Sequence, residues 1–428
     1  MTTIAHDHNP LTTVVGAPHR IPSQPQPHST NAEMSKMGLA VKWLSVSLAV
    51  YLLITAVNLV SSGFALAAGD SAATLFSYVD NVFIALSIGV LSTVLTQSSS
   101  TTTSITVGLV ASGMPIPVAI PILLGANIGT TVTSTLVALS VVPTQKGDRE
   151  IFRRSFSAAS VHDFFNVLAV AIFLPLEMMF SVLERTSSFL TSAFQQAQTN
   201  GGAEEASTFL VDITGMISTV FSALADNLLE IIVVAETNTA AGVVNGVIIL
   251  ALALVVLMFS IKTISRTLGT LLVGKTKRVM DYAISHNAFT GVLSGALITG
   301  AVQSSSATTS LAVPLVGSGG FTLRQIYPFV VGANIGTTST ALLVGVAMVG
   351  AGNTELGVLA LQAALIHVVF NVFAAALIMV VPALRQAPLR CAEGIGWLAV
   401  KNRLLALGYT VGAFIFLPAA VLLLSVIL

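Results

Sequence analysis

The sequence predicts an all-α polytopic membrane protein with two inverted-topology repeats, each with a re-entrant helical hairpin and broken transmembrane helices. Composition, duplicated motifs and the distribution of basic residues support this fold class. Of the 428 residues 54% are hydrophobic and only 8% are charged, and apolar stretches long enough to cross a bilayer recur along the chain. This apolar composition predicts a lipid bilayer as partner, and the formal net charge of zero gives no support for nucleic-acid binding, so we expect no nucleic acid as partner. The lone Cys391 excludes an internal disulfide.

An internal repeat runs through the chain. Three pairs of matching segments lie about 206 residues apart: Thr96–Gly113 with Val302–Gly319, Gly125–Thr131 with Gly332–Thr338, and His162–Asn166 with His367–Asn371. The first pair shares the run Gln-Ser-Ser-Ser, and the second pair is identical, Gly-Ala-Asn-Ile-Gly-Thr-Thr. The two halves therefore correspond almost element by element.

The first half contains a tail, a repeat and a loop. Residues 1–38 are rich in Pro, His, Ser, Thr and Gln, which predicts a disordered cytoplasmic tail. The first repeat, residues 39–180, is expected to hold a membrane helix over 39–60, a hairpin over 81–112, and helices over 119–142 and 156–180. The hairpin enters the membrane and returns, with Gln97 to Ser100 near its tip. Residues 181–245 are acidic and form the predicted extracytoplasmic loop.

The second half repeats this pattern in the opposite orientation. Residues 246–384 are expected to hold a helix over 246–261, a hairpin over 287–318, and helices over 327–349 and 357–381. Residues 385–428 are expected to form a C-terminal loop and helix. Because Lys and Arg accumulate in short cytoplasmic loops, their positions indicate which loops of the predicted topology lie in the cytoplasm. This topology leaves every basic residue except Arg185 in the cytoplasm, whereas a full crossing by either Gln-Ser-Ser-Ser segment would misplace several clusters.

The hydroxyl runs indicate a binding site. Inverted repeats with interrupted helices are typical of secondary transporters, whose substrate lies at the midplane where the broken helices meet. Helix N-termini and unwound amides suit an oxyanion, and hydroxyl and carbonyl oxygens suit a hard cation such as sodium. No Lys or Arg falls in the predicted membrane core, so we expect sodium to supply the charge that compensates the anion. We expect no other cofactor.

These duplicated motifs resemble those of the type II sodium-phosphate cotransporters. Both Gln-Ser-Ser-Ser segments, both Gly-Ala-Asn-Ile-Gly-Thr-Thr segments and Val161-His-Asp-Phe-Phe-Asn166 look like that family's repeated motifs in the right order, over about residues 40–428. The resemblance implies a secondary active symporter, and no enzyme, that couples inward sodium movement to uptake of inorganic phosphate.

The resemblance also implies the site. The phosphate ligands would be Gln97, Ser98, Ser99, Gln303, Ser304 and Ser305. The sodium ligands would be Ser100, Thr101, Thr130, Thr131, Asp163, Ser306, Thr308, Thr337 and Thr338. Supporting residues would be Asn127, Asn166, Asn334 and Asn371. Each hydroxyl has a plainer alternative role in helix packing, and Asn166 and Asn371 have one as interhelical links.

Asp163 is the acid expected deep within a membrane span, and its repeat partner is Val368. A charge at that depth needs a cation, a proton or a donor such as His162, which makes it a functional candidate. In the family resembled, an Asp at this position accompanies electrogenic transport. We therefore expect electrogenic uptake of divalent phosphate.

Differences from the animal members predict a location. The chain lacks a cysteine pair, an Asn-x-Ser/Thr site and a long C-terminal tail, which predicts a bacterial inner-membrane protein with a cytoplasmic N-terminus. A homodimer is expected by analogy with other hairpin transporters. Two alternatives stay open: a sodium-coupled dicarboxylate carrier, and a phosphate sensor that does not transport.

Overall fold

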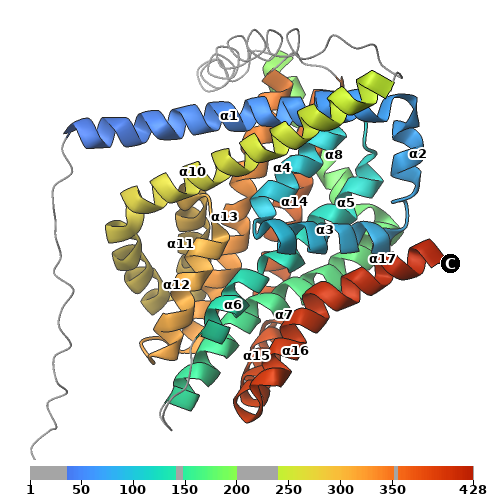
Figure 1. Cartoon of the computed structure of the whole chain (residues 1–428). Coiled ribbons are helices and arrows are strands. Elements are labelled where there is room, and N and C mark those ends of the chain that lie inside the picture. Colours follow the sequence, from blue (N-terminus) through green and yellow to red (C-terminus); the bar gives the residue numbers. More distant parts are fainter. Residues whose placement is uncertain (1–35, 141–147, 200–239, 351–354, 428) are drawn as a thin grey trace, which may run out of the picture. The chain divides into compact units, whose positions relative to one another are not determined.

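The computed structural model describes residues 36–140, 148–199, 240–350 and 355–427, and every regular element in these ranges is a helix (Figure 1). Within the described residues, seven helical segments are long and apolar enough to cross a membrane, which confirms the expected all-helical class. The expected tail lies outside the described residues up to residue 35, and so do residues 200–239 of the expected loop.

The first half of the chain forms a series of helices that are mostly where the sequence predicts them. They are α1 (Lys36–Ala68), a short 3₁₀ turn (Gly69–Ser71), α2 (Ala72–Ser77), α3 (Val82–Thr96), α4 (Ser99–Val110), α5 (Ile116–Thr130), α6 (Val132–Ser140), α7 (Asp148–Phe180) and α8 (Val182–Thr199).

Two details in this half differ from the expectation. The single helix expected over 119–142 is interrupted at Thr131, whose hydroxyl bonds the carbonyl of Ile128 at 3.0 Å and so competes with the backbone ladder. The expected loop begins with a helix, because the Glu177 carboxylate caps α8 by accepting from the amides of Leu183 at 2.6 Å and Glu184 at 3.2 Å.

The second half follows the same order. It contains α10 (Ala240–His286), α11 (Ala288–Val302), α12 (Ser305–Gly317), α13 (Leu323–Gly350), α14 (Glu355–Val380), α15 (Pro382–Lys401), α16 (Arg403–Val411), a π-helical turn (Gly412–Phe416) and α17 (Leu417–Ile427). The first of these, α10, runs well past the expected end at residue 261.

Helix α15 lies where a loop was expected from the sequence. Pro382 occupies its first turn and Lys401 its last, both favourable for a helix. It is amphipathic, with Leu389, Ala392 and Ala399 buried, and it packs along α7. The basic residues on its other side concealed this apolar stripe.

Glycines allow the repeated helices to pack at backbone distance. A Cβ at Gly125 of α5 would lie 2.1 Å from the carbonyl oxygen of Leu86 on α3, and a Cβ at Gly332 of α13 would lie 1.9 Å from that of Val292 on α11. Any side chain at either position would therefore force the helices apart. The repeated glycines thus serve close helix packing.

This packing holds two interrupted helix pairs in equivalent positions. Between α3 and α4, Gln97 to Ser100 form what we call the first polar break, and between α11 and α12, Gln303 to Ser306 form the second polar break. The hydroxyl of Thr93 on α3 donates to that of Thr102 on α4 at 2.9 Å. This bond links the helix before the first break to the helix after it.

Candidate functional site

Both polar breaks have the same unusual backbone. Gln97 has φ 55° and ψ 28°, and Gln303 has φ 58° and ψ 30°, so both adopt the left-handed conformation that favours glycine. Ser98 and Ser304 then cap the following helices, their hydroxyls accepting from the amides of Thr101 and Ala307 at 3.2 Å each. A strained glutamine at both equivalent positions indicates that its side chain is needed there.

The two breaks line one cavity of about 680 Å³. The residues of the breaks are joined there by the face of α10 that carries Met258, Ile261, Lys262, Ser265 and Arg266. The starts of α4 and α12 also border this cavity, so first-turn amides and the positive ends of two helix dipoles are close to it. Such a setting favours an anion.

The hydroxyls of the breaks differ in exposure. Ser99 and Ser305 are each 3% exposed, whereas Ser98, Ser304 and Ser306 are half-buried. Two threonines in the first turn after the breaks bond locally: the Thr101 hydroxyl donates to Ser98 Oγ at 2.9 Å, and the Thr308 hydroxyl to the Ser304 carbonyl at 2.9 Å. Neither threonine lines the cavity itself, and these bonds stabilise the first turns of α4 and α12.

Helix α13 connects the two breaks through a residue that sequence reasoning missed. The hydroxyl of Thr340 donates to Gln303 Oε1 at 2.6 Å and lies 3.5 Å from Ser100 Oγ. The amide of Gln303 donates to Ser339 Oγ at 2.8 Å and to the Gly300 carbonyl. Ser339 and Thr340 directly follow the second Gly-Ala-Asn-Ile-Gly-Thr-Thr motif, which was the available signal.

The remaining predicted threonines do not line this cavity. The hydroxyls of Thr130, Thr337 and Thr338 donate to carbonyls of their own helices, those of Ala126, Ala333 and Ile335, at 2.8, 3.0 and 2.7 Å. These bonds fit the plainer role of stabilising helices in an apolar setting.

The motif asparagines form a separate buried cluster that joins the two halves. Asn334 Nδ2 donates to Asn166 Oδ1 at 2.6 Å, and Asn166 Nδ2 donates to the Asn127 carbonyl at 2.8 Å. His162 Nε2 lies 2.6 Å from Asn334 Oδ1. The equivalent bonds in the other half are absent among the described residues: Asn371 Nδ2 bonds the carbonyl of His367, whose ring nitrogens have no partner there.

Asp163 lies in a third cluster. It is fully buried, and its Oδ2 accepts from the hydroxyls of Thr135 at 3.3 Å and Tyr409 at 3.1 Å. Its Oδ1 has no partner among the described residues. A buried carboxylate with one free oxygen and two hydroxyls on the other is suited to a small hard cation.

The structure corrects one expectation about charge. The helix over 246–261 was expected to end before Lys262 and Arg266, and the anion site was expected to have no protein cation. In the structure α10 continues through both residues, and both line the cavity of the polar breaks, which therefore has protein cations in its wall.

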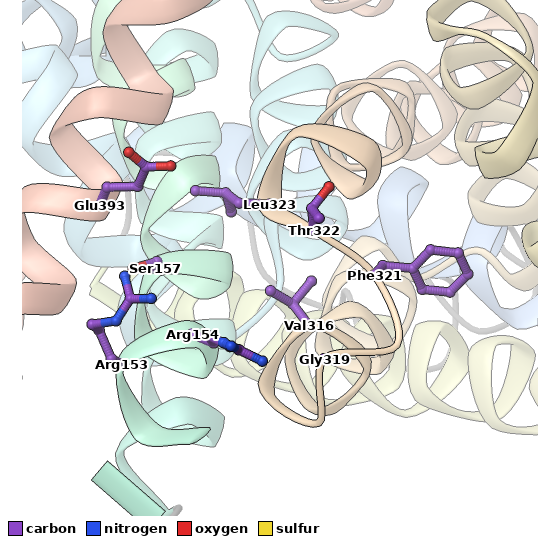
Figure 2. A pocket seen from close by; sticks show the side chains of 9 residues that line it. All are labelled: Arg153, Arg154, Ser157, Val316, Gly319, Phe321, Thr322, Leu323 and Glu393. Carbon is purple, nitrogen blue, oxygen red and sulfur yellow. The ribbon is translucent and has the colours of Figure 1, made fainter. Parts of the chain in front are cut away.

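A second cavity, of about 370 Å³, differs in its charges (Figure 2). Arg153 and Arg154 line it together with Glu393 and the loop that contains Gly319. Both guanidinium groups are already paired with Glu150, at 2.5 and 2.8 Å, and that of Arg153 also stacks on Trp397, 4.7 Å from the ring centre. Since its cations are already paired, this cavity is a weaker anion site than that of the breaks.

Comparison with known proteins gives a family match. Residues 52–190 and 256–399 match the family described as Na+/Pi-cotransporter, and these ranges include both polar breaks. Sodium-dependent phosphate transport protein 2B of Homo sapiens is 32% identical over 87% of this chain. The 2B protein of Bos taurus is 33% identical over 90% of it, and sodium-dependent phosphate transport protein 2A of Mus musculus is 31% identical over 97%.

The lengths of these relatives differ from that of the chain. The matched part spans 63% of the Homo sapiens protein, 65% of the Bos taurus protein and 72% of the Mus musculus protein. No solved structure matches the chain.

Proposed function

The chain belongs to the Na+/Pi-cotransporter family, and on that premise we propose that it is a secondary active symporter coupling inward sodium movement to uptake of inorganic phosphate. The relatives named as sodium-dependent phosphate transport proteins support this substrate pair. We further propose that uptake is electrogenic with divalent phosphate.

The observation that carries the proposal is the single cavity bordered by both polar breaks. Gln97, Ser98 and Ser99 from one half and their counterparts Gln303, Ser304 and Ser305 from the other are proposed to bind phosphate. Two helix N-termini and six polar side chains give the donors that a tetrahedral oxyanion requires. A site shared by two halves also allows access to alternate as one half moves against the other.

Sodium is proposed to bind beside this site. The unpartnered Oδ1 of buried Asp163 is the strongest support, because a carboxylate at that depth needs a compensating cation. Hydroxyl oxygens are proposed to complete the sodium sites, from Ser100, Thr101, Thr130, Thr131, Ser306, Thr308, Thr337 and Thr338. The asparagines Asn127, Asn166, Asn334 and Asn371 would hold the helices that carry them.

The topology proposed is that of two inverted repeats, with α3–α4 and α11–α12 as re-entrant hairpins. Helices α3 and α11 have 15 residues each, fewer than a full crossing requires. The distribution of basic residues supports a cytoplasmic N-terminus. We also propose a bacterial inner-membrane location and a homodimer.

Radiolabelled phosphate uptake into proteoliposomes tests the function. With sodium, potassium or protons as the only inward gradient, accumulation should occur with sodium alone. Equal uptake driven by potassium would refute sodium coupling. Sodium-driven accumulation of radiolabelled succinate but not of radiolabelled phosphate would identify a dicarboxylate carrier, and phosphate binding without accumulation would identify a sensor.

A further inference from the structure

Helix α10 presents a polar face to the second polar break. Ser265 and Arg266 follow Lys262 by three and four residues, so all three lie on one side of the helix. The Ser265 hydroxyl donates to the backbone carbonyl of Gln303 at 2.8 Å, which fixes this side toward the break. All three residues line the cavity that both breaks share.

The two cations on this face are free. Lys262 and Arg266 are exposed, and among the described residues neither forms an ion pair. The arginines of the second cavity contrast with them, since both are held by Glu150. An unpaired ammonium and an unpaired guanidinium in the wall of this cavity can both bind one anion of charge −2, the guanidinium through two parallel N–H donors.

We propose that Lys262 and Arg266 bind the phosphate oxyanion in this cavity, so that α10 forms a third wall of the site beside the two polar breaks. This inference deepens the proposed function and rests on it. Phosphate is then compensated partly by the protein, and sodium does not have to neutralise the whole charge of the anion.

A lipid headgroup shares this phosphate chemistry. The cavity wall also includes Leu95, Met258 and Ile261, and Leu95 is 82% exposed, so an acyl chain has apolar surface beside the cations. The volume of about 680 Å³ and the polar residues from both breaks favour the free anion, because a headgroup needs only the two cations. The experiment must separate these two sources.

Equilibrium binding of radiolabelled inorganic phosphate tests the proposal on the full chain in nanodiscs of phosphatidylcholine at saturating sodium. Lys262→Gln and Arg266→Gln should each raise the Kd for phosphate about tenfold, as expected for loss of one charge-assisted hydrogen bond. Lys262→Arg keeps the charge and should bind close to wild type. Arg324→Gln and Lys401→Gln remove exposed charges outside this cavity and should leave the Kd unchanged.

A structural role predicts a different pattern. If the two side chains only held the fold, the glutamine variants would lower the Tm in sodium and alter sodium binding; we expect both to stay at wild-type values. Unchanged phosphate Kd in both glutamine variants, with a wild type that binds, would overturn the proposal. The phosphatidylglycerol that purifies with each protein is measured before reconstitution into nanodiscs. If the wild type retains this lipid and the glutamine variants do not, while their phosphate Kd is unchanged, the proposal is overturned in favour of a lipid site. A wild type that fails to bind phosphate would instead refute the proposed function itself.

Discussion

Asn334 of α13 donates from its side-chain amide to the side-chain oxygen of Asn166 on α7, at 2.6 Å, and thereby joins the two halves of the chain in its buried centre. The same Asn334 bonds His162 through its oxygen, so one side chain satisfies two buried partners. The equivalent Asn127, by contrast, directs its side-chain amide to the Leu123 carbonyl of its own helix at 3.2 Å. The duplicated sequence has produced two unequal networks.

This inequality predicts unequal stabilities for equivalent substitutions. Asn334→Ala should lower the free energy of unfolding by about 1–2 kcal/mol, because His162 and Asn166 would both lose a buried partner. Asn127→Ala is the matched control and should cost less, since its side-chain amide bonds only within its own helix. Thermal unfolding in detergent measures both, and equal losses would contradict the asymmetry.

Bulk at the polar breaks should stop transport. Ser99 and Ser305 are each 3% exposed at the first position of their helices, so Ser99→Leu or Ser305→Leu would fill space where backbone and anion approach each other. We expect phosphate uptake to fall to background in either variant, while the amount of folded protein stays the same. Ser192→Leu, on an exposed site of α8, is the control. Normal uptake by either break variant would place the site elsewhere.

Replacing the left-handed Gln97 by glycine should raise stability and lower activity. Gln97 makes no side-chain hydrogen bond among the described residues, so Gln97→Gly should relieve backbone strain and add about 0.5–1 kcal/mol of stability. The same change should reduce phosphate uptake. Gln303→Gly should not stabilise, because it removes bonds to Ser339 and Thr340. Unfolding curves and uptake rates of both variants decide the matter.

Local sequence signals predicted some of this arrangement and missed the rest. The breaks were predictable because a capping serine and a hydroxyl run interrupt two apolar stretches at equivalent positions. The continuation of α10 past residue 261 was not predictable, because the basic residues there resemble a cytoplasmic loop. Lys262 and Arg266 were therefore not expected near the site. The contact of Asp163 with Tyr409 spans 246 residues and depends on tertiary packing that no local pattern encodes.

Tyr409 should tune the proposed sodium site. Its ring packs against Phe164 and Phe414, with centroids 5.9 and 6.1 Å away, and its hydroxyl donates to Asp163 Oδ2 at 3.1 Å. Tyr409→Phe keeps the packing and removes one hydrogen bond to the carboxylate, which should shift the apparent sodium affinity about two- to tenfold. The maximal uptake rate and the Tm should change little. Tyr78→Phe, at an exposed site, is the control. An unchanged apparent sodium affinity in Tyr409→Phe would indicate that Asp163 does not bind sodium.

Asp163 itself should determine the voltage dependence of uptake. If its free oxygen binds sodium, the loaded carrier has a net positive charge with divalent phosphate, and each charge that crosses the full field gains about 2.3 kcal/mol per 100 mV. An inside-negative potassium diffusion potential should therefore accelerate initial phosphate uptake in the wild type and in an Asp80→Asn control.

Asp163→Gly should lose this acceleration while it keeps some sodium-dependent uptake, because the hydroxyl ligands would still bind the remaining sodium ions. Initial rates measured with and without the potential distinguish the cases. Voltage-insensitive uptake by the wild type would refute electrogenic transport. A correctly folded Asp163→Gly variant with no uptake at all would mean that the carboxylate is required for transport as such, because then the hydroxyls alone cannot support a sodium-loaded carrier.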